Sequence, residues 1–581
     1  MSISYKQQDF VNIKDFGAKG DGSTDDTAAI QSAINTGKPI FIPYGNYVCD
    51  QVTFIGNAII SGPGVILHAS DSYAITVAPT LPTPVACTIT TVAATSGSLM
   101  HNTTQLVATS HGLVVGDVIK VSADATYSYS ASAYVAEMAR VQRVVDANTV
   151  VLDHQIEDFA TSATSIKYFK VPRHIVDINV NMDRYGSLVG TTDYPVIAIF
   201  SAINPKVVLN GKKLWGTGIY AIQCWGGSLA IYCDDIDQDT TVAGRIGYGV
   251  VVGGASRGVS VTGSVSGSRH AVTSLNFANG SYDETKLIYC GISTDINVHD
   301  MVSTGSNLTA FDTHEMARRW TFNNCKAIGM VPKYAAETTA IAFFDRGIDT
   351  SYYNCIAHNC RVAFQLSGGE SGHAVGTNYN TISNPIIHNA TYAAFSVSNT
   401  AAIDTQVITI SNPTVKSCYQ AVYSGIKTNF IITGGYISSN VTMFNVYGAG
   451  NIIVSGTHLK LNSASFPFII NNSAGTRKAR FIGVTFDGTA RGICRLFDGA
   501  NTFSIDMIDC QVLATLSHNI KENDATTQNN VFVVLSHTST GSPESVWDAD
   551  IGSRFFRTDG GASTACYIKE SGVANTGWVA K

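Results

Sequence analysis

Short runs of alternating apolar and polar residues recur along most of the chain. The clearest repeats are 349–369, 378–399, 405–426, 429–450 and 451–472, each with two alternating runs separated by Asn, Gly or Ser. Alternation with a period of two is typical of β-strands, and Asn, Gly and Ser are residues of tight turns. The repeat length, about 21 to 30 residues, falls in the range of solenoid proteins. The pattern therefore predicts stacked coils, each made of three short strands.

A small residue followed by a phenylalanine recurs at the same place in successive repeats. The pairs are Ala310-Phe311, Ala342-Phe343, Ala363-Phe364 and Ala394-Phe395. Stacked coils place like residues above like, so we expect these phenylalanines to form one interior column. Leucine-rich repeats would show an L-x-x-L-x-L pattern and a helical half, which the sequence lacks, and a β-sandwich does not require such self-similarity. We therefore predict an all-β fold, a parallel β-helix.

Both ends of the chain, and one internal stretch, depart from the repeat. Ser23 or Thr24 is a candidate N-cap for a short helix with an apolar stripe, which would cover the open end of the first coil. Residues 84–171 read as strands joined by turns and predict a small all-β insertion domain. We divide the chain into a cap and first coil (1–48), first β-helix coils (49–83), the insertion (84–171), the main β-helix (172–524) and a C-terminal β module (525–581).

Composition narrows the possible functions. The chain has 581 residues, of which 14% are charged, and its net charge is −6. Without a basic stripe, this charge does not favour nucleic acid as a partner. No run of about 18 apolar residues predicts a membrane span, and the first residues lack the apolar core of a secretory signal. The 12 cysteines show no zinc-binding spacing, so we expect buried thiols, no metal and no cofactor.

Charged residues gather on three neighbouring repeats, whereas Ser, Thr, Asn and Tyr fill the predicted outward positions of most others. The candidates are Arg269 and His270 on the first repeat, Asp312, His314, Glu315, Arg318 and Trp320 on the second, and Glu337, Asp345 and Arg346 on the third. Such a concentration is unusual on a chain with so few charges. An ion-pair ladder without catalytic function is the alternative interpretation.

The alternation of the strand assigns a face to part of this group. Asp312 and His314 are two residues apart, so their side chains point the same way. Phe311 has the opposite parity and should lie inside, so we place Asp312 and His314 outside. His270 shares their face if it stacks on Gly249, and a shift of one residue would turn it inward.

Both ends of the chain resemble a known family. Residues 10–48, from Phe10-Val-Asn-Ile-Lys-Asp-Phe-Gly to Lys38-Pro-Ile-Phe-Ile-Pro-Tyr-Gly-Asn-Tyr, resemble the opening of the pectate-lyase superfamily, as found in bacteriophage tailspike depolymerases. Ile551-Gly-Ser-Arg-Phe-Phe-Arg and Cys566-Tyr-Ile-Lys-Glu-Ser-Gly resemble the C-terminal segment of many phage tail fibres and tailspikes.

The resemblance implies a right-handed β-helix and a homotrimer that is made in the host cytoplasm and carried on the virion tail. The implied partners are a bacterial surface polysaccharide and a virion tail or adaptor protein. The motif set of the related polygalacturonases is absent, and tailspikes vary their catalytic residues. The resemblance therefore assigns no catalytic position in this sequence.

Cleavage of a polysaccharide by hydrolysis requires two carboxylates, one as acid and one as base or nucleophile. Asp312 paired with Glu315 or Asp345 would supply them, and the number of carboxylates makes hydrolysis our preferred expectation. A lyase would instead need a base and a cation that holds a uronate carboxylate. His270 or His314 would be that base.

Other residues of the group would bind the substrate. Arg269 or Arg318 would hold a uronate, and we expect further sugar contacts from Arg346, Trp320 and Glu337. Two further functions stay open. A non-catalytic receptor-binding spike would stack sugars on Trp215, Trp225 and Trp320. A deacetylating esterase would recruit Asp312 and His314, although the chain has no GxSxG motif.

Overall fold

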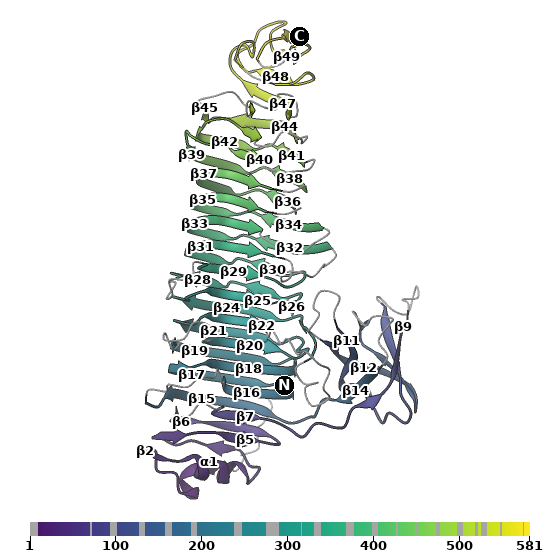
Figure 1. Ribbon diagram of the computed structural model, residues 1–581, viewed down its shortest axis with the longest axis vertical. Coiled ribbons are helices and arrows are strands. Elements are labelled where there is room, and N and C mark those ends of the chain that lie inside the picture. Colours follow the sequence, from purple (N-terminus) through teal and green to yellow (C-terminus); the bar gives the residue numbers. More distant parts are fainter. Residues whose placement is uncertain are drawn as a thin grey trace. The chain divides into compact units, whose positions relative to one another are not determined.

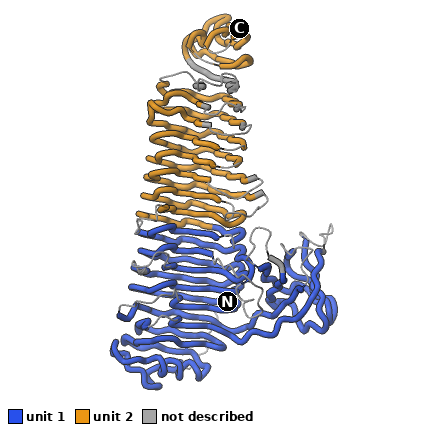
Figure 2. The backbone as a smooth tube through the Cα atoms, in the orientation of Figure 1, with its two compact units in different colours: residues 1–321, 331–338 blue, residues 322–330, 339–581 orange. Residues whose placement is uncertain are grey.

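The structure, a computed structural model, divides into two compact units, one of residues 1–321 and 331–338 and the other of residues 322–330 and 339–581 (Figure 2). It describes residues 10–69, 73–92, 102–126, 134–156, 165–186, 195–237, 247–274, 290–314, 317–330, 339–367, 377–397, 405–425, 428–447, 450–471, 477–496, 503–516, 521–523, 531–546, 549–572 and 575–581. No helix in these ranges is long and apolar enough to cross a membrane. Most elements are strands (Figure 1), which confirms the predicted all-β class.

Near its start the first unit contains a 3-10 helix, η1 (Ile13–Phe16), and the short helix α1 (Thr27–Ile34). Ile30, Ala33 and Ile34 of α1 are buried, as the apolar stripe predicts. The N-cap is Asp26 and not Ser23 or Thr24. The backbone amides of Ser23 and Thr24 donate to Asp21, which holds them in a preceding strand instead. The first strands are β1 (Val11–Asn12), β2 (Asp21–Asp25), β3 (Ile40–Phe41), β4 (Asn46–Cys49), β5 (Val52–Phe54), β6 (Ala58–His68) and β7 (Ile75–Val77).

The coils of the first unit stack strands in parallel register (Figure 1). One column contains β6, β15 (Val176–Arg184), β17 (Lys206–Trp215), β19 (Ser228–Asp237), β21 (Ser260–Ser266) and β24 (Asn297–Thr304). A second column contains β7, β16 (Pro195–Ile203), β18 (Thr217–Trp225), β20 (Tyr248–Gly253), β22 (His270–Ser274) and β25 (Thr309–Thr313). A short pair, β23 (Ser293–Thr294) and β26 (Ala317–Arg318), lies in the same unit.

An antiparallel sheet is inserted between the early coils of the first unit, within the range predicted for an insertion. Its spatial order is β8 (Val85–Ala86), β14 (Ile166–Lys170), β11 (Val118–Thr126), β12 (Tyr134–Asp146), β13 (Thr149–Leu152), β10 (Thr103–Val107) and β9 (Thr88–Val92). It has its own core, which includes Leu106, Ile119 and Val150. Lys120 fixes the sheet to the coils, because its buried ammonium donates to the Gly254 carbonyl over 3.1 Å.

The second unit has the same architecture of stacked parallel strands. One column contains β29 (Ile341–Asp345), β31 (Ile356–Leu366), β33 (Ile386–Val397), β35 (Thr414–Ser424), β37 (Tyr436–Val446), β40 (Ile469–Asn471), β43 (Cys494–Leu496) and β46 (Lys521–Asn523). Another contains β30 (Ser351–Tyr353), β32 (Thr377–Ser383), β34 (Thr405–Ser411), β36 (Thr428–Thr433), β38 (Gly450–Ser455), β41 (Arg477–Ile482), β44 (Phe503–Val512) and β47 (Val531–Ser539). The remaining strands are β28 (Lys326–Ile328), β39 (His458–Ser463), β42 (Thr485–Ala490) and β45 (Thr515–Leu516), and β27 (Thr321–Asn323) contains the division between the units.

The interior column of phenylalanines is present as predicted. Phe343, Phe364 and Phe395 are fully buried, and their ring centroids lie 4.8 and 5.8 Å apart in successive coils. The Asn breaks of the repeat turn the chain, since Asn354 and Asn384 adopt left-handed φ angles of 54° and 51° that Asn tolerates. The Asn384 amide also donates to Asn354 over 3.0 Å, so the turns stack as a ladder.

The last strands change direction. β48 (Arg554–Arg557), β49 (Cys566–Lys569) and β50 (Trp578–Ala580) pair antiparallel in that order, and Phe555 packs edge-on against Trp578. The structure thus confirms a parallel β-helix with a capping helix, a β insertion and a C-terminal β module. The predicted domain boundaries stay a prediction.

Candidate functional site

Asp312 lies at the centre of a group of polar side chains on β22 and β25 of the first unit. Its side chain is completely buried. Oδ2 of Asp312 is 3.1 Å from Nε2 of His314 and 3.7 Å from Nε2 of His270. The Thr273 hydroxyl, directly across the strand pair, is 3.3 Å from the same oxygen. We call Thr273, His270, Asp312 and His314 the His-Asp cluster.

The strand register brings the cluster together. Val272 pairs with Phe311, which is in the core, and Thr273 pairs with Asp312. Since residues alternate along a strand, Thr273 and Asp312 point away from the side on which Phe311 packs. Asp312 therefore has the expected parity, but its side chain is covered and does not lie at the surface. The backbone amide of His314 donates to the Ser274 hydroxyl over 2.7 Å and so anchors the end of β25.

His270 is one residue out of the expected register, which is the shift that turns a strand residue inward, and its side chain is buried. It pairs with Tyr248, on whose ring it stacks at 4.9 Å between centroids, and not with Gly249. Nδ1 lies 2.8 Å from the Thr309 carbonyl, which only accepts, so that nitrogen has the proton. Burial lowers the pKa of His270 to about 4, although Asp312 opposes the shift. At neutral pH His270 is therefore uncharged. Its Nε2, 3.7 Å from Asp312, has no proton.

His314 is the more accessible histidine, with 15% of its side chain exposed. As a carboxylate, Asp312 can only accept a hydrogen bond, and in that form it places the proton of His314 on Nε2. Nε2 is the nitrogen of His314 that contacts Asp312, so Nδ1 is the candidate base of the ring. A carboxylate that orients a histidine in one tautomer is the arrangement of many acid–base sites.

The predicted substrate-binding residues near the cluster differ in their surroundings. Arg269 is partly exposed next to His270, and its charge contributes to the low pKa of that histidine. Arg318 is almost fully buried in β26. Trp320 is completely buried, and its indole N–H donates to the Ser293 carbonyl over 3.2 Å. The expectation that Trp320 stacks on a sugar is therefore wrong, because the ring is part of the core.

Asp345 and Arg346 belong to the second unit. Asp345 is completely buried and accepts hydrogen bonds from the Gly347 amide, the Thr350 hydroxyl and the Asn380 side chain. The expectation of an outward catalytic carboxylate there is wrong, because Asp345 has the parity of the buried Phe343. Arg346 lies over the Phe344 ring at 4.8 Å. Glu315 and Glu337 lie outside the described residues.

Sequence reasoning missed the residues that support the cluster from the neighbouring strand. Thr273 and Ser274 contact Asp312 and the His314 backbone, and Tyr248 packs on His270. The available signal was the distance between repeats, since the correct register places Thr273 opposite Asp312. Without a fixed register these residues look like the other Ser, Thr and Tyr positions.

The comparisons with known proteins agree with this architecture. Residues 10–76 match the family model described as rhamnogalacturonase A/epimerase, pectate lyase-like. The preneck appendage protein of Bacillus phage PZA is 40% identical over 55 residues, which is 9% of this chain and 6% of that protein. The chain thus matches only a small part of the length of this curated relative.

Two solved tailspikes share the fold over most of the chain. The tailspike gp61 of Pseudomonas phage phi297 has a TM-score of 0.60 and 14% identity, and the match covers 99% of this chain and 96% of gp61. The gp54 tailspike of Acinetobacter baumannii bacteriophage AP22, solved in complex with capsular saccharide, has a TM-score of 0.50 and 12% identity over 90% of this chain and 79% of gp54. The predicted resemblance is confirmed: the chain has the pectate-lyase-like parallel β-helix fold of phage tailspikes.

Proposed function

We propose that this protein is a tailspike that binds and cleaves a bacterial surface polysaccharide, with His314 as the general base. The observation on which the proposal rests is the contact of 3.1 Å between His314 and the buried Asp312. A histidine held in one tautomer by a buried carboxylate and partly open to solvent is suited to take a proton. The saccharide bound to the AP22 tailspike, which shares the fold, supports a polysaccharide as the substrate.

The geometry favours β-elimination over hydrolysis. The carboxylate of the cluster is fully buried and is held by His314 and Thr273, so Asp312 orients the base and does not reach the sugar. In an elimination, His314 takes the proton from the carbon beside a uronate carboxylate. The bond from the next ring carbon to the glycosidic oxygen breaks, a carbon–carbon double bond forms, and the departing oxygen takes a proton from solvent.

Arg269 is the cation that we assign to the uronate. Arg269 directly precedes His270 in the chain and is partly exposed. Its guanidinium can therefore approach a carboxylate from the solvent side. Withdrawal of charge from that carboxylate makes the neighbouring proton more acidic, which is what a base of ordinary strength requires.

The test is incubation of the protein with capsular polysaccharides from a panel of strains, followed by size-exclusion chromatography with ultraviolet detection. We expect shorter chains whose new ends absorb in the ultraviolet, because elimination leaves a double bond conjugated with the carboxylate. Shortening without new absorbance would mean hydrolysis, for which Asp312 with Glu315 is the candidate pair. No shortening of any polysaccharide that the protein binds would leave a non-catalytic receptor-binding spike.

We also propose that the protein is a homotrimer on the virion tail, attached to a tail or adaptor protein. The phage appendage protein and the tailspikes with the same fold support this assignment. Light scattering coupled to size-exclusion chromatography should give the mass of three chains, and a mass of one chain would contradict the trimer.

A further inference from the structure

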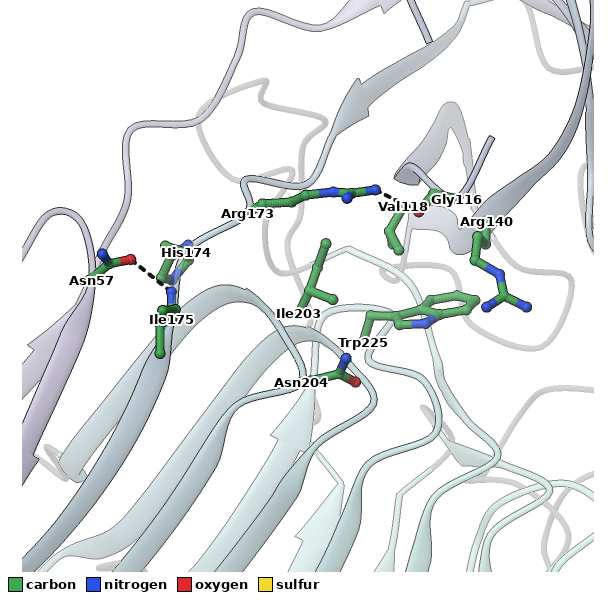
Figure 3. A pocket seen from close by; sticks show the side chains of 10 residues that line it. All are labelled: Asn57, Gly116, Val118, Arg140, Arg173, His174, Ile175, Ile203, Asn204 and Trp225. Carbon is green, nitrogen blue, oxygen red and sulfur yellow. Dashed lines mark hydrogen bonds between the residues drawn. The ribbon is translucent and has the colours of Figure 1, made fainter. Parts of the chain in front are cut away.

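A pocket of about 450 Å³ lies in the first unit between the insertion sheet and the turns of the coils (Figure 3). The insertion contributes Arg140 from β12, and the segment that leads from the insertion into β15 contributes Arg173 and His174. The coils contribute Asn204, directly after β16, and Trp225, the last residue of β18. Figure 3 shows the Trp225 indole beside Arg140, with the Arg173 side chain extended along the opposite wall.

The pocket has an aromatic and aliphatic floor. Trp225 and Ile203 pack against a small core of Val118, Met138, Val171 and Ala255, which joins the insertion to the coils. The Trp225 side chain is only partly buried, and the Arg257 guanidinium lies 5.9 Å from the centroid of its ring, so the exposed part of the indole is what a ligand can contact. An aromatic ring on a firm apolar base is the usual platform for the apolar face of a sugar.

The polar part of the pocket is positively charged. Its ten lining residues include two arginines and no carboxylate, although the chain as a whole has a net charge of −6. The Arg140 and Arg173 side chains are 55% and 60% exposed. Asp117, which pairs with Arg173 at 3.2 Å, is shared with Lys170 at 2.8 Å, so two cations face one carboxylate there. Asp153 is 3.7 Å from Arg140, which is a loose pairing.

Uncharged hydrogen-bonding groups complete the lining. Asn57 and Asn204 are exposed at the edge of the pocket, and the Asn57 side-chain oxygen accepts from the Ile175 amide over 2.9 Å. Burial lowers the pKa of His174, so that the ring is neutral and can exchange hydrogen bonds with hydroxyl groups. Few charged groups, several amides and one aromatic ring are the chemistry of a carbohydrate site.

We infer that this pocket is a binding subsite for a sugar ring that has a carboxylate group. The ring stacks on Trp225, and its carboxylate accepts from Arg140 and Arg173, whose planar guanidinium groups match a carboxylate. The inference rests on the proposed function and adds to it: the insertion holds an acidic polysaccharide and does not cleave it.

The position of the pocket relative to the His-Asp cluster supports this role. Trp225 is bridged in parallel to Arg257, and Arg257 to Thr294, which in turn pairs with Arg318. Trp225 and Arg318 are therefore three rungs apart, or about 15 Å along the stack. Arg318 follows four residues after His314 in the chain. The inferred arrangement is an extended polysaccharide that occupies the pocket with one sugar while another lies at His314.

The test is ligand-observed NMR by saturation transfer, with glucuronate, galacturonate and N-acetylneuraminate as probes and glucose as the uncharged comparison. We expect the wild type to bind at least one acidic probe and to bind glucose more weakly. The double variant Arg140→Gln/Arg173→Gln should bind that probe at least about ten-fold more weakly, the loss expected for charged hydrogen bonds. Arg480→Gln is the matched control, since Arg480 is also an ion-paired arginine, is 44% exposed and lies in the second unit. This variant should bind the probes as the wild type does.

Two results would overturn the inference: no binding of any of the three acidic probes by the wild type, or unchanged binding by the folded double variant. Arg140→Gln alone, which breaks only the loose contact with Asp153, should weaken binding in the same direction if the double variant is unstable. His314→Gln separates the two proposals, because it should abolish cleavage and keep probe binding. If the wild type cleaves the polymer but binds no acidic probe, the inferred subsite is refuted and the proposed function still stands.

Discussion

The exchange Asp312→Asn changes the charge of one buried side chain and almost nothing of its shape. In the wild type the carboxylate accepts from Nε2 of His314 at 3.1 Å and lies 3.3 Å from the Thr273 hydroxyl. An asparagine keeps the volume but presents an NH₂ group or a weaker carbonyl acceptor to His314. When the NH₂ group faces Nε2, that nitrogen must accept, and the proton moves to Nδ1. The lone pair that we assign to catalysis is then lost.

The size of the effect follows from the role of a positioning residue. General acid–base catalysis contributes about 10² to 10⁴ in rate, so we expect kcat to fall by about that factor. KM should change little, since the fully buried Asp312 does not touch the sugar. Stability should change by no more than about 1–2 kcal/mol, because loss of the charge also removes the cost of burying it.

The assay measures initial rates of polymer cleavage over a range of substrate concentrations and pH values, with thermal unfolding as the check on folding. Asp487→Asn is the matched control, since Asp487 lies 3.2 Å from Nε2 of His458 in an exposed His–Asp pair of the second unit. That variant should keep the activity of the wild type. A folded Asp312→Asn protein with kcat within about three-fold of the wild type would refute the role of Asp312, since a wrong tautomer costs far more.

Three further predictions concern stability. The first is that the pKa of His270 falls from its ordinary value of 6.5 to about 4 on folding. As pH falls from 6.5 to about 4, the unfolded chain therefore takes up a proton that the folded chain does not. The free energy of unfolding should decrease over this interval by on the order of 3 kcal/mol. Denaturant unfolding at several pH values should show this loss, and His270→Gln should reduce it; an equal loss in the variant would contradict the assignment. Asp345→Ala removes the acceptor of the Gly347, Thr350 and Asn380 hydrogen bonds and should cost about 3 kcal/mol or more in thermal unfolding, with unchanged kcat per folded molecule. Phe364→Ala opens the stack between Phe343 and Phe395 and should cost about 3–5 kcal/mol, whereas a change below about 1 kcal/mol would mean that the column is not tightly packed.

The fold was largely predictable because it repeats. Each Ala-Phe pair reports the same interior position, so errors in one repeat are corrected by the next. The same column also indicates the side of the strand on which Asp345 lies. When Phe343 is aligned with Phe311, Asp345 lies opposite Thr313. Both residues come two positions after a buried ring, so Asp345 should lie on the inner side of its strand. Asp345 looked like Asp312 only because both follow a phenylalanine closely.

The candidate site was less predictable because it depends on register and on contacts outside the repeat. His270 stacks on Tyr248 and not on Gly249, a difference of one residue that spacing alone does not fix. Trp320 lies in a turn where the repeat gives no parity, and its indole N–H donates to the Ser293 carbonyl of the core. The pocket at Trp225 joins residues of the coils to Arg140 of the insertion. A contact between the insertion and the coils leaves no periodic pattern in the sequence.

The most direct test of the central claim compares the wild type with His314→Gln on a capsular polysaccharide that the protein binds. Polymer length and ultraviolet absorbance are followed together in one time course. The account predicts that the wild type shortens the polymer while absorbance rises, and that His314→Gln binds the same polymer with neither change. Shortening by His314→Gln at the rate of the wild type would contradict the account, because the polymer would then be cleaved without its base.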